Sequence, residues 1–171
     1  LLLYSDIQVA HVNLHHEAGI RGVDPARILF AQPWANEKHL ARLRLCDLFL
    51  DTLPYNAHTT GSDALWAGLP VLTCTGTSFP GRVGSSLLQA LGLPELVTDS
   101  LLQYEAMALR LATEPSLLAS LRQRLAVNRH TTPLYDTPTY TRNLESAYAL
   151  MVERARANLL PAPFGVARQT G

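Results

Sequence analysis

Lysine is almost absent from this sequence: Lys38 is the only one, and the other basic residues are arginines. Fourteen acidic residues balance the fourteen basic ones, so the formal net charge is zero. A protein that binds nucleic acid through its phosphates needs a basic surface to neutralise them. No basic stripe runs along this chain, and we therefore expect no nucleic-acid partner.

Long apolar runs and cysteine pairs are also missing. No apolar run reaches the 18 residues of a membrane span, and the opening "LLLYSD" is too short for a signal peptide and has no basic flank. It is typical of a core strand met in mid-chain, so the sequence is interpreted as a piece of a longer protein. Cys46 and Cys74 lie in apolar surroundings without a CxxC motif, which favours free thiols in a reducing compartment, the cytoplasm.

Several catalytic motifs are absent as well. There is no GxGxxG dinucleotide fingerprint and no GxSxG nucleophile elbow. The stretch "GTSFPGRV" (76–83) has phosphate-loop spacing, but Arg82-Val83 replaces the Lys-Ser/Thr pair, and a flexible loop is the better interpretation. His11 and His15 share a helix face, yet no third ligand is set by spacing, so no metal site is predicted.

What the sequence does have is an alternation of short apolar runs and helical periods. Apolar residues make up 47% of 171 residues, enough for one domain with a core. The pattern predicts strands at 1–5, 27–31, 47–52, 70–75 and 95–99, and helices at 6–21, 36–46, 61–68, 82–92, 100–113, 115–129 and 138–158. Apolar strands that alternate with helices indicate an α/β fold with a doubly wound parallel sheet and C-terminal helices. We expect one domain over 1–158, including the helices at 100–158, and an irregular tail at 159–171.

The most informative stretch is "NAHTTGSDALWAG" (56–68), which follows the predicted strand 47–52. In such sheets ligands bind beyond the carboxyl ends of the strands, where a helix N-terminus offers free N–H groups and the positive end of its dipole. His58, Thr59 and Thr60 add donors, Gly61 allows close approach of a phosphate, and Asp63 on the first turn can accept from a ribose hydroxyl. The alternative is that Thr60 or Ser62 merely caps the helix and His58 is an ordinary loop histidine.

A second candidate site lies in "QPWANEKHLAR" (32–42), after the strand 27–31. Asn36 is a candidate N-cap of the helix that follows. His39 and Arg42 share one helix face at i and i+3, where they can stack on and hydrogen-bond a base. The alternative is a solvated polar face, which is the commoner role of exposed His and Arg.

The stretches "RILFAQPWANEKHLARLRLCDLFLDTLPYNAHTTGSDALWAGLPVLT" and "GRVGSSLLQALGLPELV" resemble the O-GlcNAc transferase/SPINDLY glycosyltransferases, most closely their bacterial members. The resemblance covers about residues 1–155, with "HTTGSDALWAG" its most specific part. It implies the Rossmann-like, nucleotide-sugar-binding C-terminal half of a GT-B enzyme. Such enzymes are inverting and metal-independent, and transfer GlcNAc from UDP-GlcNAc to a protein Ser or Thr hydroxyl, releasing UDP. The family's tetratricopeptide repeats, N-terminal catalytic half and proposed base lie upstream, so the resemblance assigns no catalytic residue here.

The same resemblance assigns roles to individual residues. The phosphate ligands correspond to His58, Thr59 and Thr60, the ribose-binding acid to Asp63, and the base-recognition group to His39, Arg42 and the Ala35 backbone. Two positions depart from the animal enzymes. Asn36 replaces a lysine that reaches the ribose, and Tyr55 replaces a cysteine near the N-acetyl group. A tyrosine also stands there in plant fucosyl-transferring relatives, whereas His58, which is threonine in those relatives, favours GlcNAc.

Two other classes of function stay open at this point. One is another GT-B sugar-nucleotide enzyme: a protein O-fucosyltransferase, a transferase with a small acceptor, or an epimerase. The other is a non-catalytic nucleotide-binding scaffold. Sequence upstream of Leu1 distinguishes them, because tetratricopeptide repeats favour the protein glycosyltransferase.

Overall fold

A computed structural model describes residues 1–167 of the chain, and these form two compact units, one over Leu1–Arg42 and the other from Leu43 onward. The last four residues of the predicted irregular tail lie outside the described residues. Each unit contains parallel strands joined by helices, as the apolar strand pattern predicts. The prediction of one domain over 1–158 stays a prediction.

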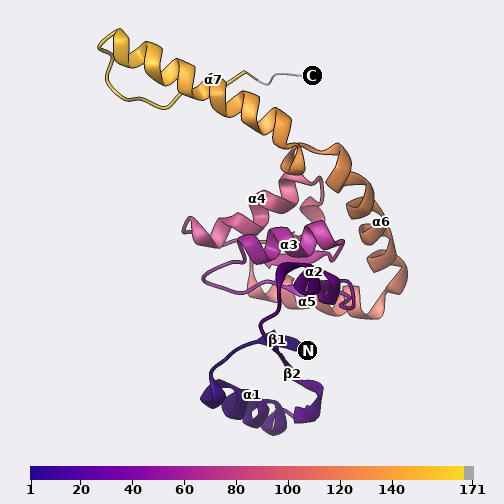
Figure 1. Cartoon of the computed structure of the whole chain (residues 1–171). Coiled ribbons are helices and arrows are strands. Elements are labelled where there is room, and N and C mark those ends of the chain that lie inside the picture. The colour runs from indigo at the N-terminus through magenta and orange to yellow at the C-terminus, as the bar shows by residue number, and fades with distance from the viewer. Residues whose placement is uncertain (168–171) are drawn as a thin grey trace. The chain divides into compact units, whose positions relative to one another are not determined.

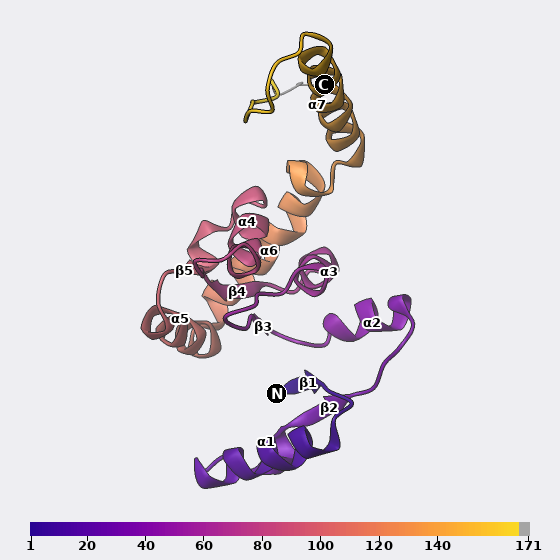
Figure 2. The same cartoon turned by 90° about the vertical axis from the view of Figure 1, so that its left-hand side faces the viewer.

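The first unit is a small α/β unit (Figure 2). Its elements are β1 (Leu2–Tyr4), α1 (Gln8–Ile20), β2 (Leu29–Ala31) and α2 (Asn36–Leu43), the last ending one residue into the second unit. β1 and β2 pair in parallel with Leu3 opposite Phe30. The predicted start of the second strand, Arg27, belongs instead to a 3-10 turn, because Asp24 caps the Pro25–Arg27 segment by accepting from the Ala26 N–H at 2.9 Å.

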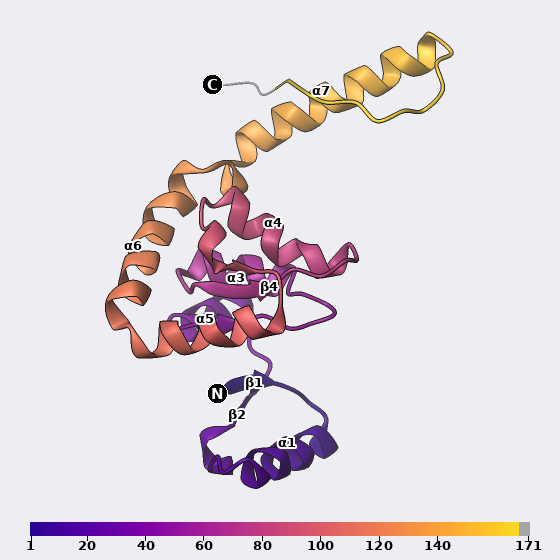
Figure 3. The same cartoon turned by 180° about the vertical axis from the view of Figure 1, so that it is seen from behind.

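The second unit contains a three-stranded parallel sheet with the order β3-β4-β5. Its elements are β3 (Phe49–Leu50), α3 (Thr59–Ala67), β4 (Val71–Cys74), α4 (Val83–Ala90), β5 (Val97–Thr98), α5 (Leu101–Thr113), α6 (Pro115–Thr131) and α7 (Thr137–Arg156). Consecutive strands follow one another across the sheet, so right-handed crossovers place α3 and α4 on one face. Figures 1 and 3 show α3 and α4 on that face and α5 on the opposite one, which gives the predicted doubly wound arrangement.

The core of the second unit lies on both faces of β4. All four residues of β4 are buried, as expected for a central strand covered by helices. Leu65 of α3 and Leu88 of α4 are fully buried, as are Leu111 of α5 and Leu125 of α6. Gly68 ends α3 in the left-handed conformation with φ 90°, where a glycine is favoured, and its N–H donates to the Leu65 carbonyl.

Within the residues that the structure describes, neither Cys46 nor Cys74, which is buried in β4, forms a disulfide. No helix within residues 1–167 is both long and apolar enough to cross a membrane.

Candidate functional site

The loop 52–58 joins the carboxyl end of β3 to the N-terminus of α3, as predicted. The helix begins at Thr59, two residues earlier than the sequence pattern suggests. Its N-cap is His58, which makes no side-chain capping bond, so the alternative in which Thr60 or Ser62 caps the helix is wrong. The first intrahelical bond is donated by the Ser62 N–H to the His58 carbonyl at 3.0 Å. The N–H groups of Thr59, Thr60 and Gly61 precede that bond and have no partner four residues back in the helix.

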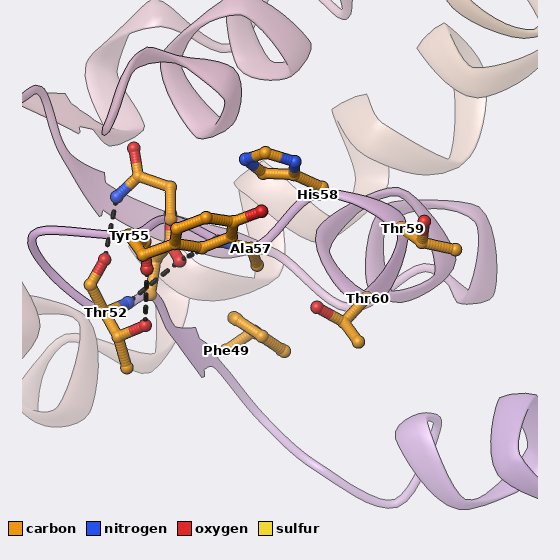
Figure 4. Close-up of a pocket in the computed structure, with 9 residues that line it drawn as sticks. Phe49, Thr52, Tyr55, Ala57, His58, Thr59 and Thr60 are labelled. Carbon is orange, nitrogen blue, oxygen red and sulfur yellow. Dashed lines mark hydrogen bonds between the residues drawn. The ribbon is translucent and has the colours of Figure 1, made fainter. Parts of the chain in front are cut away.

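A cavity of about 390 Å³ opens at this helix N-terminus. Tyr55, His58, Thr59 and Thr60 line it, and Figure 4 shows the two rings beside the start of α3. The other lining residues are Phe49, Asp51, Thr52, Asn56 and Ala57. The structure therefore brings together four of the residues predicted from sequence, on one wall formed by the loop and the first turn of α3.

The His58 ring is held by three neighbours. Its Nε2–H donates to the Pro80 carbonyl at 3.4 Å, which leaves Nδ1 for other partners. Tyr55 stacks on one side, with ring centroids 4.8 Å apart and an interplanar angle of 19°. Phe79 meets the ring edge-on at 6.1 Å. His58 is thus a positioned side chain with a defined orientation at the rim of the cavity.

Gly61 and Asp63 do not line the cavity. Gly61 is buried, and a Cβ there would lie 3.3 Å from the Ala57 side chain, a tight contact with the preceding loop, and at an ordinary contact distance of 3.7 Å from Leu87 of α4. Because α3 begins at Thr59, Asp63 is its fifth residue and lies beyond the predicted first turn. The half-buried Asp63 lies near Tyr135, whose pKa is raised mainly by burial and also by that carboxylate.

Two buried polar residues, Asp51 just before the loop and Asn56 within it, were not singled out from sequence. The Asp51 carboxylate accepts from the backbone N–H groups of Thr52 at 2.8 Å and Ala57 at 2.6 Å, and from the Thr73 hydroxyl at 2.7 Å. Asn56 donates through its side-chain amide to the Thr52 carbonyl at 2.8 Å, and several of these bonds are drawn in Figure 4. An acidic residue directly after an apolar strand was the available signal for Asp51, since it falls at the carboxyl end of the sheet.

Tyr104 of α5 supports the same corner from the opposite face of the sheet. Its hydroxyl donates to the Asp51 carbonyl oxygen at 2.9 Å. Burial, then the nearby Asp51 charge, raises the pKa of Tyr104 to about 12. The hydroxyl consequently stays protonated and donates at neutral pH.

The loop 76–82, which the sequence suggests is flexible, closes on itself and packs against the site. The Gly76 N–H donates to the Gly81 carbonyl at 2.6 Å, and the Arg82 guanidinium donates to the Thr77 carbonyl. The Pro80 carbonyl also accepts the Asn56 N–H at 3.1 Å. The loop is therefore a packed neighbour of the 52–58 loop.

The other predicted residues belong to the first unit. Arg42 donates to His39 Nδ1 at 2.8 Å and to the Gln32 carbonyl at 2.9 Å, and its guanidinium lies 4.9 Å from the centre of the Trp34 ring. The Ala35 carbonyl accepts the His39 N–H at 3.0 Å. Asn36 is the first residue of α2 rather than its N-cap. His39 and Arg42 do pair on one helix face, as their spacing predicts.

His11 and His15 contact an aromatic ring. His11 stacks on Phe30 at 3.7 Å and donates to the Ser5 carbonyl at 2.9 Å, and His15 lies 5.3 Å from the same ring. Across the part of the chain that the structure describes, no group of three His, Cys, Asp or Glu side chains could hold a metal ion. Packing and hydrogen bonds account for both histidines.

Comparison with a solved structure defines the class of this domain. The chain is similar to a mutant of the O-GlcNAc transferase of Thermobaculum terrenum, with a TM-score of 0.85 and 35% identity over 92% of this chain and 31% of the solved one. The fold is therefore that of a part of a GT-B glycosyltransferase.

The family follows from the sequence model of glycosyl transferase family 41, which matches residues 2–144. The chain belongs to this family, and the resemblance stated from its motifs is confirmed. It is 39% identical to the UDP-N-acetylglucosamine--peptide N-acetylglucosaminyltransferase of Caenorhabditis elegans over 81% of this chain. A probable enzyme of the same name from Arabidopsis thaliana, SEC, is 39% identical over 78%. The chain spans only 12% and 14% of the lengths of these two relatives.

Proposed function

We propose that this chain is the donor-binding part of an inverting, metal-independent protein O-glycosyltransferase that moves GlcNAc from UDP-GlcNAc to a Ser or Thr hydroxyl. The observation that carries the proposal is the open first turn of α3: its first N–H groups have no partner within the helix, and its residues Thr59 and Thr60 line a cavity together with His58. The names of the relatives from Caenorhabditis elegans and Thermobaculum terrenum give the sugar and the reaction.

The chemistry of the cavity wall suits a diphosphate. A phosphate oxygen is an acceptor, and every group that we assign to it is a donor: backbone N–H groups at the start of α3, two threonine hydroxyls and the His58 ring. We include Gly61 in this set through its N–H group. The positive end of the helix dipole adds to the attraction. Among residues 1–167, neither Lys nor Arg lines the cavity.

These donors also explain how the reaction would proceed without a metal. As the glycosidic bond breaks, negative charge gathers on the departing UDP. Fixed donors aimed at its phosphates stabilise that charge, which is the role that a divalent cation has in other enzymes. The residue that removes the proton from the acceptor hydroxyl belongs to the upstream part of the protein in this proposal.

Base and ribose recognition are assigned to other residues. We propose that His39 and Arg42, joined by their 2.8 Å hydrogen bond, present a flat polar face to uracil together with the Ala35 backbone. Asp63 is the proposed acceptor for a ribose hydroxyl, and Asn36 makes a weaker contact there than a lysine would. Tyr55 is the proposed neighbour of the sugar's N-acetyl group.

The remainder of the protein completes the proposal. The chain spans a small share of its relatives, and we propose that an N-terminal catalytic half and tetratricopeptide repeats precede it and that its partner is an acceptor protein or peptide. We further propose that residues 1–158 act as one nucleotide-sugar-binding domain within a cytoplasmic enzyme.

Calorimetric titration of UDP tests the proposal on the full protein. The wild type should bind UDP, and His58→Ala should weaken binding by about tenfold or more, since one hydrogen bond to a charged group is lost. His16→Ala, at an exposed histidine of α1, is the matched control and should bind as the wild type does. Equal affinities of wild type and His58→Ala would remove His58 from the site, and no binding of UDP to the wild type would refute the proposed function.

A further inference from the structure

We propose that Asp51 is a positioning residue of the donor site: its buried carboxylate fixes the 52–58 loop so that the first turn of α3 faces the diphosphate. This inference rests on the proposed function, because it concerns the geometry of the same cavity. Asp51 is 7% exposed and directly follows β3. Its backbone N–H continues the sheet by donating to the Leu72 carbonyl at 3.0 Å, which anchors it to the rigid core.

The Asp51 carboxylate contacts residues near both ends of the 52–58 loop. One oxygen, Oδ1, accepts from Thr52 at the start of the loop and from Ala57 near its end, at 2.8 and 2.6 Å. Ala57 precedes the N-cap of α3 by one residue. A single oxygen atom thus links the end of β3 to the entry of the helix, and the position of the α3 N-terminus relative to the sheet depends on it.

The second oxygen is fixed from the neighbouring strand and helix. Oδ2 accepts from the fully buried Thr73 hydroxyl of β4 at 2.7 Å. It also lies beside Gly84 in the first turn of α4, where a Cβ would come within 2.6 Å of it. The carboxylate therefore cannot turn away without breaking a buried hydrogen bond, and its direction is set independently of the loop.

The Asp51 side chain has enough acceptor sites for the donors that it binds. A carboxylate offers several lone pairs on two oxygens and gives stronger hydrogen bonds than a neutral acceptor, so it holds three donors at once. The Ala57 N–H is satisfied by Oδ1, whereas the N–H groups of Thr59, Thr60 and Gly61, which follow it, are left for the ligand. The Ala57 N–H therefore holds the loop in place, and the three N–H groups after it are the ones that we assign to phosphate.

The test compares ligands with and without phosphates in the full protein. Asp51→Ala removes all three bonds, and Thr73→Val removes only the one from β4. Each variant should weaken UDP binding, by roughly tenfold for each hydrogen bond to the carboxylate whose loss displaces the N-terminus of α3. Uridine, which has no phosphates, should bind each variant as it binds the wild type. Asp51→Asn keeps an oxygen for both backbone donors and should stay within roughly threefold of the wild type for UDP.

Thr98→Val is the matched control for Thr73→Val. Thr98 is also a buried threonine, on β5, but its hydroxyl donates to the Thr73 carbonyl at 3.0 Å rather than to Asp51. A merely structural loss would affect both variants alike, whereas positioning predicts weaker UDP binding for Thr73→Val alone. In turnover assays, a misplaced α3 should raise the KM for UDP-GlcNAc and lower kcat/KM by about 100-fold for Asp51→Ala, with the acceptor KM unchanged.

Three results would overturn the inference. They are wild-type UDP affinity in both Asp51→Ala and Thr73→Val, an equal loss of UDP and uridine binding, and an equal effect of Thr73→Val and Thr98→Val. If Asp51→Ala does not fold, the comparison of Thr73→Val, Thr98→Val and Asp51→Asn still decides. The proposed function fails separately, through a wild-type protein that does not bind UDP.

Discussion

Gly84 offers the sharpest prediction about the stability of this corner of the fold. It is the second residue of α4 and is buried. A Cβ at this position would lie 2.6 Å from Asp51 Oδ2, 2.7 Å from the Thr73 hydroxyl and 3.1 Å from Thr73 Cβ. Contacts under 3.0 Å force a neighbour to move, and here the neighbours are a buried carboxylate and a threonine inside the central strand.

The magnitude of Gly84→Ala follows from opposing effects. Alanine in a helix is favoured over glycine by about 0.5–1 kcal/mol. Forcing a methyl group into a packed interior costs about 1–3 kcal/mol, and loss of a hydrogen bond to a charged group costs about 1.5–3 kcal/mol. The unfavourable effects are larger, and Gly84→Ala should lower the free energy of unfolding by about 2–5 kcal/mol.

Urea unfolding followed by circular dichroism measures this change. Gly19→Ala is the matched control, because Gly19 is also a helical glycine but the nearest atom to its Cβ is Pro25 Cγ at 3.9 Å. That variant should be as stable as the wild type or slightly more stable. A Gly84→Ala variant that is as stable as Gly19→Ala would contradict the packing of Asp51 and Thr73 described above.

Three further predictions concern pH, the core and metal. Tyr104→Phe loses the bond to the Asp51 carbonyl and should lower the free energy of unfolding by about 1 kcal/mol at pH 8. Because folding raises the Tyr104 pKa from 10.0 to about 12, this stabilisation is fully present below pH 10 and is lost as the pH rises towards 12. The difference in free energy of unfolding between Tyr104→Phe and the wild type, measured by urea unfolding, should therefore shrink over that range. Leu125→Ala should cost about 2–5 kcal/mol by the same assay, whereas Val127→Ala, 57% exposed on the same helix, should change stability by less than about 0.5 kcal/mol. EDTA should leave glycosyl transfer by the full protein unchanged, and activity that is lost on chelation and restored by magnesium would contradict a metal-free reaction.

Much of the fold could be predicted because its signals are local. The run "PVLTCT" contains the fully buried strand Val71–Cys74, and apolar strands of this kind occur in sheets that helices cover on both faces. The boundaries were harder to predict. Pro94–Leu96 forms a 3-10 turn where the apolar pattern suggests a strand, because a proline at its first position favours a turn and carries no N–H for a sheet.

The position of the candidate site could be predicted from the sequence, but the buried residues that hold its loop in place could not. A polar stretch between a strand and a helix predicts where ligands bind, and Tyr55, His58, Thr59 and Thr60 do line one cavity. The roles of Asp51 and Gly84 depend on contacts between residues far apart in sequence, 51 with 73 and 84, which no local pattern encodes. Gly61 illustrates the same limit, since the Leu87 side chain of α4 fills the space beside it.

The scarcity of positive charge near the cavity has a consequence for how substitutions should act. Half of the donors assigned to phosphate are backbone N–H groups, which no side-chain substitution removes. Replacing one side-chain donor such as His58 leaves the others in place, whereas moving the start of α3 misaligns several donors together. Asp51→Ala should therefore impair turnover more than His58→Ala does, although Asp51 is buried and bears the same sign of charge as the phosphates. A ranking in the opposite order would mean that the side chains, rather than the helix N-terminus, supply most of the attraction for the diphosphate.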